Sequence, residues 1–319
     1  MTPLVEAIGL HRRYRLAAGR TLRALDGIDL AIEPGDTVGL VGESGSGKST
    51  LGRTLVGLQT ATVGTVRFAG RDVFGARGPA LETLRRQRQF IFQDPSAALN
   101  PRMTIATTLS EHMAALGVRR TDRRARGVSA LALAGLDASF AGRYPHELSG
   151  GQRQRAVIAR ALSTDPEFVV ADEPVSALDV STRAQVVNLL AELQRARRLT
   201  MLFISHDLSI VAHLCRRVAV MYLGRLVEVG TRDALFAAPL HPYTHALMSA
   251  VPIPDPRRER HRRRIVLNSE SPDAAAVPSG CRFHPRCARA TSICREVDPV
   301  LVQAADQHFV ACHHADAAQ

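Results

Sequence analysis

A short segment near the start of the chain strongly constrains the fold that the chain can adopt. Residues 42–49 read Gly-Glu-Ser-Gly-Ser-Gly-Lys-Ser, which matches the phosphate-loop pattern G-x-x-x-x-G-K-S/T at every position. An apolar run at 37–41 precedes the loop, and a helical pattern from about Lys48 to Gly57 follows it. This strand, loop and helix order directs the loop N–H groups and the positive end of the helix dipole toward a bound phosphate. The chain is therefore predicted to bind a nucleotide here.

Lysine occurs once in the chain, at Lys48 inside this loop, although lysine and arginine together number 41. Lysine carries a compact charge on a thin stem that fits between two phosphates, whereas the arginine guanidinium is a wide planar fork. We expect Lys48 to neutralise the β- and γ-phosphates, and the Ser49 hydroxyl to bind Mg²⁺. The other loop residues predicted to contact the nucleotide are Gly42, Ser44, Gly45, Gly47 and Thr50.

Strand and helix patterns alternate through the rest of the core. Apolar strand-like runs lie at 168–171 and 200–204, and helical segments lie near 180–197 and 207–215. Such alternation is typical of a mainly parallel sheet with helices on both faces. Residues 4–35 read as short strands with turns. The predicted fold is α/β, with a P-loop (RecA-like) core, a mostly parallel sheet and antiparallel N-terminal strands.

Two changes of composition suggest domain boundaries. Residues 96–162 are alanine-rich and helical in pattern, which predicts an inserted α-helical subdomain. A proline-rich break follows Val251 and leads into the run RRERHRRR at 257–264, read either as a solvated linker or as a segment attracted to anionic lipid headgroups. The predicted parts are a catalytic core (1–95 and 163–250), the helical subdomain (96–162), and a linker with a small cysteine module (251–319).

The charge and hydropathy of the chain bear on its partners. The formal charge of +11 and the pI near 10.5 suggest nucleic-acid binding. However, the aromatic content is 4% with no tryptophan, which leaves few stacking platforms, and the arginine excess is typical of an arginine-biased genome. We therefore expect no nucleic-acid partner.

No apolar run reaches the roughly 18–20 residues of a membrane span, and the first residues do not resemble a signal peptide. A cytoplasmic protein, or one held at a membrane by a partner, is expected.

The segment FVVADEP at 168–174 places two carboxylates at the end of an apolar strand. Asp172 is expected to hold the Mg²⁺ shell, and Glu173 to polarise a water for in-line attack on the γ-phosphate. Acidic strand ends are common, so this interpretation depends on the phosphate loop upstream.

The segment LSGGQ at 148–152 contains two glycines, which allow the backbone to approach an anion, and Ser149 reads as a helix N-cap. It resembles the signature sequence of ABC-transporter ATPases, and the resemblance covers about residues 4–235. The other motifs of that family also occur, in the family's order. Gln93 in FQDP resembles the Q-loop, SALD at 176–179 resembles the D-loop, and His206 in ISHD resembles the switch histidine. Tyr14 takes the place of the aromatic residue that stacks on adenine, although packing within a strand is the alternative.

The resemblance implies that ATP is held between the phosphate loop of one subunit and the signature of another. It implies catalytic roles for Glu173, His206 and Gln93, and a link from Gln93 to a membrane subunit. The implied Mg²⁺ ligands are Ser49, Gln93 and Asp172. The residues implied to serve the partner's nucleotide, or the seam between subunits, are Ser149, Gly150, Gly151, Gln152 and Asp179.

Three longer stretches narrow the resemblance. FQDPSAALNPRMTI (92–105), YPHELSGGQRQR (144–155) and HPYTHALMSAVP (241–252) resemble ATPase subunits of oligopeptide/dipeptide importers. The segments ESGSGKSTLGR (43–53) and LNPRMT (99–104) favour the second of the two ATPase types that these importers usually carry. This implies a heterodimer with a paralogous ATPase, two integral-membrane permease subunits, an extracytoplasmic solute-binding protein, and a peripheral location on the cytoplasmic face of the cell membrane. Nickel and other small-solute importers share the branch and are the alternative.

Two other classes of ABC protein agree less well with the chain. DNA-repair and chromosome-maintenance ATPases insert long coiled-coil arms before the signature, but Lys48 and Leu148 are only 100 positions apart here. Translation-type ABC proteins usually carry two cassettes, and this chain has one phosphate loop.

The five cysteines are unevenly distributed. Cys215 stands alone and reads as a small buried apolar residue. The others have the spacing C-x5-C-x6-C-x17-C, without the C-x2-C pairs of a zinc ribbon, and in a reducing cytoplasm such clustering suggests a metal before a disulfide. The segment resembles the cysteine tail of the importer branch, although Ala288 stands where that branch usually has proline. The resemblance implies a 4Fe–4S cluster, with zinc or free thiols as alternatives. The candidate ligands are Cys281, Cys287, Cys294 and Cys312.

Overall fold

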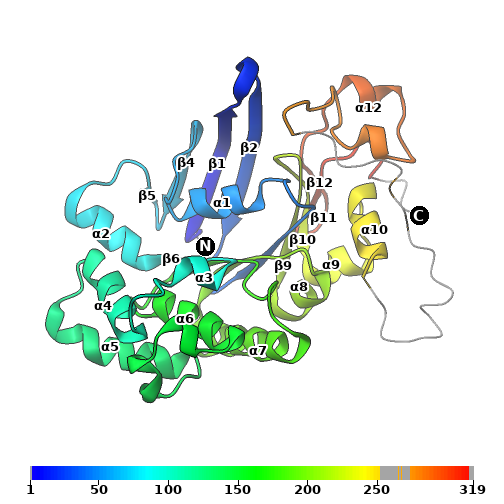
Figure 1. Ribbon diagram of the computed structural model, residues 1–319. Coiled ribbons are helices and arrows are strands. Elements are labelled where there is room, and N and C mark those ends of the chain that lie inside the picture. The colour runs from blue at the N-terminus through cyan, green and yellow to red at the C-terminus, as the bar shows by residue number, and fades with distance from the viewer. Residues whose placement is uncertain (1, 252–264, 266, 268–273, 316–319) are drawn as a thin grey trace.

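The computed structural model describes residues 2–251, 265, 267 and 274–315 (Figure 1). The arginine run at 257–264 lies outside these residues. The described strands form two sheets, one of eight strands in the order β11-β12-β10-β9-β3-β8-β7-β6 and one of four strands in the order β2-β1-β4-β5. No helix in the described ranges is both long and apolar enough to cross a lipid bilayer.

Five parallel strands form the centre of the larger sheet, as the alternation of strands and helices predicted. Nearly all of their residues are buried, because helices or the second sheet cover both faces. Along one strand, Val169 and Ala171 face the helical core while Phe168 and Val170 face the smaller sheet. The strands are β6 (Arg88–Ile91), β7 (Phe168–Asp172), β8 (Thr200–Ile204), β3 (Thr37–Val41) and β9 (Arg217–Tyr222).

Two long strands occupy the N-terminal region, so the expectation of short strands there is wrong. Strand β1 (Val5–Arg15) pairs antiparallel with β2 (Thr21–Ile32). Their pairing shifts register three times, and each irregularity interrupts the alternation of apolar and polar residues that marks a long strand in sequence. Strands β4 (Val63–Phe68) and β5 (Arg71–Asp72) complete this sheet.

The C-terminal residues extend the large sheet. Strand β12 (His308–Val310) pairs antiparallel with β10 (Arg225–Thr231) and with β11 (Val302–Ala305), and β10 in turn pairs with β9. The cysteine segment runs from Cys281 to Cys312. Its Phe283 is fully buried among core aromatic rings. The cysteine segment is therefore joined to the core by both backbone pairing and side-chain packing. The domain boundaries drawn from the sequence remain a prediction.

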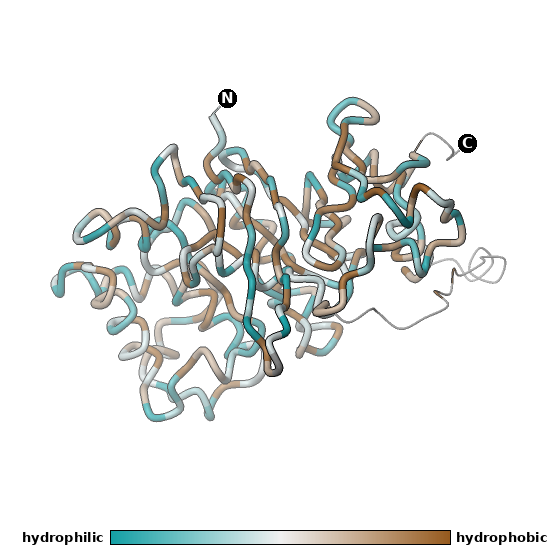
Figure 2. The backbone as a smooth tube through the Cα atoms, turned by 90° about the horizontal axis from the view of Figure 1, so that it is seen from above, coloured by the Kyte–Doolittle hydropathy of each residue, from teal (hydrophilic) through white to brown (hydrophobic). Residues whose placement is uncertain are grey.

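The region between β6 and β7 is helical, with α3, α4 and α5 leading into α6, which contacts β6 and α7. In Figure 1 the helical part and the C-terminal part lie on opposite sides of the central strands, and Figure 2 shows the same backbone from above. The helices are α1 (Lys48–Leu55), α2 (Gly78–Gln87), α3 (Pro95–Ala98), α4 (Ile105–Ala115), α5 (Arg120–Leu133), α6 (Gly150–Leu162), α7 (Val180–Arg197), α8 (Leu208–Leu214), α9 (Arg232–Ala237), α10 (Pro242–Ser249) and α12 (Ser292–Glu296).

Candidate functional site

A cleft of about 550 Å³ lies where the phosphate loop meets the smaller sheet and the carboxyl ends of the parallel strands. Ligand sites in open α/β sheets occur at this edge. Ten of the twelve residues that line this space are ones that the sequence pattern selected. The lining residues are Tyr14, Leu22, Ala24, Ser44, Gly45, Gly47, Lys48, Ser49, Thr50, Gln93, Glu173 and His206.

The phosphate loop needs glycine at two positions for steric reasons. Gly42 and Gly47 have φ values of 151° and 108°, which residues with a side chain rarely adopt. A Cβ at Gly42 would lie 2.1 Å from the Met221 carbonyl oxygen, and one at Gly47 would lie 2.2 Å from the Ala24 carbonyl oxygen. The loop is therefore pressed between strand β2 and the end of strand β9, which shapes it before any nucleotide arrives.

Lys48 is folded back onto its own loop. Its Nζ donates to the backbone oxygens of Gly42 and Glu43 at 2.6 and 2.8 Å, and the residue is only 6% exposed. Burial lowers the pKa of Lys48, and the nearby carboxylates of Glu173, Asp172 and Glu43 act in the opposite direction. The ammonium is thus held by weak acceptors that phosphate oxygens could replace.

Ser49 and Asp172 form an oxygen-rich pair beside the cleft. The Ser49 Oγ donates to Asp172 Oδ1 at 3.0 Å, and Asp172 is 2% exposed. Burial raises the pKa of Asp172, while the bond from Ser49 and the charges of Arg53 and Lys48 lower it. A hydroxyl and a carboxylate next to a phosphate site are the donors that Mg²⁺ prefers, so these residues fit the ion that the phosphate loop implies.

Glu173 is the point where the expected catalytic residues meet. Its Oε2 accepts from Gln93 Nε2 at 3.1 Å, and His206 Nδ1 lies 3.2 Å from its Oε1. Glu173 has a positive φ of 44°, and its N–H donates to the Ile204 carbonyl oxygen at 3.0 Å. A non-glycine residue in this backbone region is strained, and such strain concentrates at functional sites. Gln93 contacts Glu173 rather than the Ser49–Asp172 pair, so its role as a metal ligand stays a prediction.

Tyr14 faces the cleft from strand β1. Its hydroxyl donates to Gln59 Oε1 at 3.1 Å, and the Arg12 guanidinium carbon lies 4.7 Å from the ring centroid. These contacts orient the ring, and adenine stacking on it stays a prediction. Leu22 and Ala24 also line the cleft, and the sequence pattern did not predict them. Nothing distinguishes them from other apolar strand residues, so no sequence signal was available.

The signature residues lie apart from the cleft, at the N-terminus of α6. Ser149 caps this helix by accepting from the Gln152 N–H at 3.3 Å, and Gln152 Oε1 accepts from the Ser149 N–H at 3.0 Å. A Cβ on Gly151 would meet Thr182 Cγ2 at 2.2 Å, so the signature packs tightly against α7. None of residues 149–152 lines the cleft described above.

Asp179 begins α7 and is held by local hydrogen bonds. Its carboxylate accepts from the Thr182 N–H at 2.9 Å, from Ser181 Oγ at 2.7 Å and from Thr182 Oγ1 at 2.8 Å. These bonds, first the one from the Thr182 backbone, hold the pKa of Asp179 far below its usual range. Asp179 is therefore an exposed, firmly charged residue that also lies outside the cleft.

The four C-terminal cysteines share one neighbourhood without forming a recognisable metal site. Burial raises the pKa of Cys281 to about 11, with smaller contributions from the other three thiols. The Sγ atoms of Cys287 and Cys312 each accept a backbone N–H at 3.4 Å. Within the ranges that the structure describes, no three or more His, Cys, Asp or Glu side chains are arranged to hold a metal ion. This arrangement does not support the iron–sulfur cluster expected from the resemblance.

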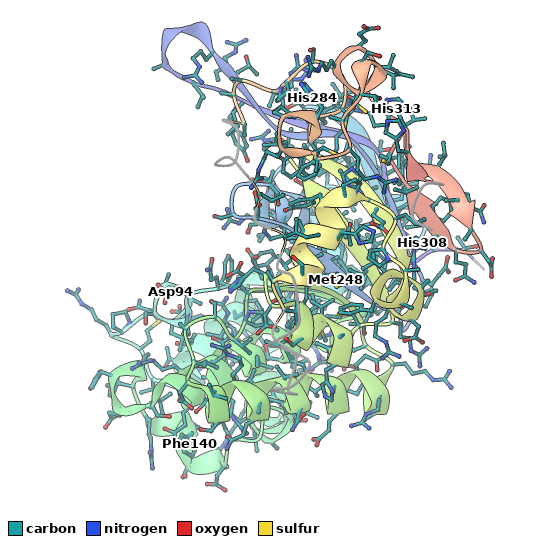
Figure 3. The ribbon with its side chains drawn as sticks, turned by 90° about the vertical axis from the view of Figure 1, so that its right-hand side faces the viewer. Asp94, Phe140, Met248, His284, His308 and His313 are labelled. Atoms are coloured by element: carbon teal, nitrogen blue, oxygen red, sulfur yellow. The ribbon has the colours of Figure 1, made fainter. Side chains whose placement is uncertain are left out.

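Nearby histidines are engaged in other contacts. Figure 3 shows His284 and His313 at the end of the molecule farthest from Phe140. His284 Nδ1 lies 2.9 Å from the Cys281 carbonyl oxygen, and His313 Nε2 lies 2.9 Å from the Val297 carbonyl oxygen. Cys215, in contrast, is buried as predicted, and burial raises the pKa of its thiol strongly.

Two family profiles match the chain. The ABC transporter profile covers residues 25–176, which include the phosphate loop, the signature and the strand-end carboxylates. The profile of the oligopeptide/dipeptide transporter C-terminal region covers residues 227–294.

Two relatives and one solved structure resemble the chain over most of its length. A putative oligopeptide transport ATP-binding protein, YkfD of Bacillus subtilis, is 49% identical over 313 residues, covering 98% of this chain and 95% of that protein. The oligopeptide transport ATP-binding protein AppF of the same species is 50% identical, covering 92% and 89%. The dimeric, post-hydrolysis structure of the ATP-binding cassette MJ0796 with ADP and Pi is 29% identical with a TM-score of 0.64, covering 72% of this chain and 98% of that one.

Proposed function

The chain belongs to the ABC transporter family, whose ATP-binding cassettes hydrolyse ATP, and we propose that this ATPase powers the import of oligopeptides or dipeptides. One observation carries the proposal for the reaction. Lys48, Ser49 and Glu173 with its two partners line a single cleft, and Asp172 lies beside it, hydrogen-bonded to Ser49. The proposal for the cargo is supported by the C-terminal region and by the names of the relatives.

Each group in the cleft has a distinct proposed task. Lys48 exchanges its two backbone acceptors for phosphate oxygens, while Ser49 and Asp172 hold Mg²⁺, which neutralises developing phosphate charge when bound. Glu173 accepts a proton from the attacking water. Gln93 and His206 contact the two oxygens of Glu173 and orient its carboxylate, and both line the same cleft.

The signature and Asp179 are proposed to complete the ATP site of a partner subunit. Ser149 lies at a helix N-terminus, where an anion is stabilised, but this end lies outside the chain's own cleft. Val180, next to Asp179, is 80% exposed although it is apolar, which agrees with a surface that a second cassette covers. ATP would then close a head-to-tail dimer, and hydrolysis would reopen it.

We further propose the complete importer as the setting. It comprises a paralogous ATPase, two permease subunits and an extracytoplasmic solute-binding protein, with this chain on the cytoplasmic face of the cell membrane. A nickel or other small-solute importer is the second candidate, because it belongs to the same branch.

Transport by the assembled importer tests the function. The full complex should be purified through its permease, placed in vesicles with ATP on the cassette side, and supplied with binding protein and labelled peptides of two to eight residues. Peptide uptake that requires ATP and is lost in Lys48→Arg is expected. Uptake of Ni²⁺ without peptide uptake would favour the second candidate, and ATPase activity that neither cargo stimulates would contradict both.

For Cys281, Cys287, Cys294 and Cys312 we propose a 4Fe–4S cluster, with zinc and free thiols as the competing outcomes. The proposal is supported by four thiols in one neighbourhood, although the described geometry does not form a ligand set. Protein purified without oxygen should be brown, with broad visible absorption that fades on reduction. Colourless protein with one zinc per chain, or with four thiols reactive toward a thiol reagent, would contradict it.

A further inference from the structure

The cysteine segment contacts the phosphate loop through an ion pair. Arg286 lies between Cys281 and Cys287, and its guanidinium binds the Glu43 carboxylate at both oxygens. The distances are 2.8 Å from Nη1 to Oε2 and 3.0 Å from Nη2 to Oε1, across 243 positions of sequence. Glu43 is the second residue of the phosphate loop. A paired fork of this kind is among the strongest and most directional contacts between side chains.

The backbone of Glu43 is held as firmly as its side chain. Its N–H donates to the Tyr243 hydroxyl at 2.7 Å, and Tyr243 is fully buried in α10. Its carbonyl oxygen accepts from Lys48 Nζ at 2.8 Å. One loop residue therefore connects the lysine of the ATP site to two residues that lie C-terminal to the parallel sheet.

A second contact holds the other side of the loop. Arg282, four residues before Arg286, is 5% exposed and donates to the Asp26 carboxylate and to the Leu223 carbonyl oxygen. Gly224, which follows Leu223 in the chain, donates its N–H to the carbonyl oxygen of Ser46 in the phosphate loop at 2.8 Å. The cysteine segment therefore supports the loop both directly and through the turn that follows β9.

The negative charge of Glu43 explains why its ion pair with Arg286 matters for ATP binding. A carboxylate beside the phosphate loop repels the anionic triphosphate of ATP, and this repulsion is weakly screened where side chains are buried. The Arg286 side chain is 6% exposed and that of Glu43 is 27% exposed, so solvent covers the pair only in part. Bidentate pairing cancels the negative charge and fixes where the carboxylate points.

We propose that Arg286 is a positioning residue for ATP binding, which neutralises Glu43 and holds the phosphate loop in the shape that receives the triphosphate. The cysteine segment is thereby a working part of the ATP site. This inference rests on the proposed ATPase function and adds to it a group from outside the cassette motifs. Arg286 acts through Glu43 and does not itself line the nucleotide cleft.

Charge variants of the pair test the inference in the full complex. We expect Arg286→Ala to raise the KM for ATP about tenfold while kcat changes less than about threefold. Glu43→Gln, which removes the negative charge and leaves an amide oxygen that can still accept from Arg286, should raise KM less than Arg286→Ala does. The double variant should regain most of the loss, because the carboxylate that repels ATP is gone. Arg295→Ala, an exposed arginine of the same segment, is the matched control and should leave KM unchanged.

Equilibrium binding of a fluorescent ATP analogue separates this inference from the proposed function. If the wild type binds the analogue but shows no turnover, the catalytic proposal fails while Kd still reports on Arg286. If Arg286→Ala does not fold, Arg286→Lys serves instead, because it keeps the charge without the forked guanidinium. Its Kd should lie between that of the wild type and the weaker value expected for Arg286→Ala. An unchanged Kd and KM in Arg286→Ala or Arg286→Lys, or a double variant as weak as Arg286→Ala, would overturn the proposal.

Discussion

The Ser49 hydroxyl donates a 3.0 Å hydrogen bond to Oδ1 of Asp172, although 123 positions of sequence separate the two residues. Strands β3 and β7 both pair with β8 and run parallel, so their carboxyl ends reach the same edge of the sheet. The phosphate loop follows one of these strands and Asp172 ends the other. The pair is therefore a direct consequence of the parallel order, and its oxygens lie beside the position expected for Mg²⁺.

Replacing Asp172 with asparagine should separate nucleotide binding from metal-dependent hydrolysis. The amide keeps the shape and an acceptor for Ser49 but removes the charge that the metal needs. We expect ATP binding in EDTA to change less than about threefold, and Mg²⁺-dependent turnover to fall about 100-fold or more. A magnesium titration of ATPase activity measures this. Asp165→Asn, at a highly exposed carboxylate, is the control, and normal turnover in Asp172→Asn would contradict the metal role.

Lys48→Arg should abolish hydrolysis although the positive charge is retained. The lysine ammonium fits between two backbone oxygens at 2.6 and 2.8 Å, and the residue is only 6% exposed. The guanidinium is wider and cannot occupy this position without displacing the loop. Turnover is expected to fall at least 100-fold, as measured by phosphate release. The reverse exchange at an exposed site of the same helix, Arg53→Lys, should leave activity within about twofold. Normal ATP affinity and hydrolysis in Lys48→Arg would refute the steric argument.

Glu173→Gln should bind ATP and then stop in the closed dimer. Glutamine keeps the contacts to Gln93 and His206 but cannot accept the proton of the attacking water. With ATP, size-exclusion chromatography together with the partner ATPase should show a persistent dimer, and turnover should fall about 100-fold or more. Glu167→Gln, an exposed glutamate just before the same strand, is the control. Wild-type turnover in Glu173→Gln would exclude Glu173 as the general base.

The parts of this fold that the sequence predicted well are those with local causes. Strands β3 and β8 have the predicted boundaries, 37–41 and 200–204, because each is a short apolar run closed by polar residues. The cleft was also predictable, since most of its members belong to motifs. The long strands β1 and β2 were not, because bulges interrupt their alternation.

Contacts that depend on distant pairing had no sequence signal. The Arg286–Glu43 pair exists because β12 extends the sheet beyond β10 and the cysteine segment then lies over the phosphate loop. Neither residue belongs to a pattern that names the other. The arrangement of the four thiols was also not predictable, because their spacing in sequence does not say whether their Sγ atoms converge.

Gly151→Ala should destabilise the protein through a single methyl group. The added Cβ would lie 2.2 Å from Thr182 Cγ2, so either the Thr182 side chain must rotate, which disturbs its hydroxyl bond to Asp179, or one of the two helices must shift. Overpacking of this kind typically costs about 1–3 kcal/mol in the free energy of unfolding. Chemical denaturation measures the loss, and Thr182→Ser, which removes that methyl group but keeps the hydroxyl bonded to Asp179, should restore most of it. Equal stability of Gly151→Ala and the wild type would show that α6 and α7 pack less tightly than described.

Two buried histidines predict how stability depends on pH. Burial lowers the pKa of His112 to about 4 and that of His241 to about 3, with further lowering by Arg160 and His245 respectively. In the unfolded chain both titrate near about 6.5, so below that pH the unfolded state binds protons that the folded state does not. Their contribution to the free energy of unfolding is therefore fully present above about pH 7 and is lost as the pH falls toward 4. By pH 5 the loss is about 2 kcal/mol for each histidine.

The variant His112→Gln isolates one of these contributions. Glutamine can still donate to Gln89 Oε1, which His112 Nε2 contacts at 2.9 Å, but it takes up no proton. Free energies of unfolding measured by urea denaturation at pH 7.5, 6 and 5 should decline less steeply in this variant, by about 2 kcal/mol over the range. His213→Gln, at an exposed histidine of α8, should keep the wild-type slope. If His112→Gln also keeps that slope, His112 is protonated in the folded protein, and the buried pocket that excludes its charge does not exist in solution.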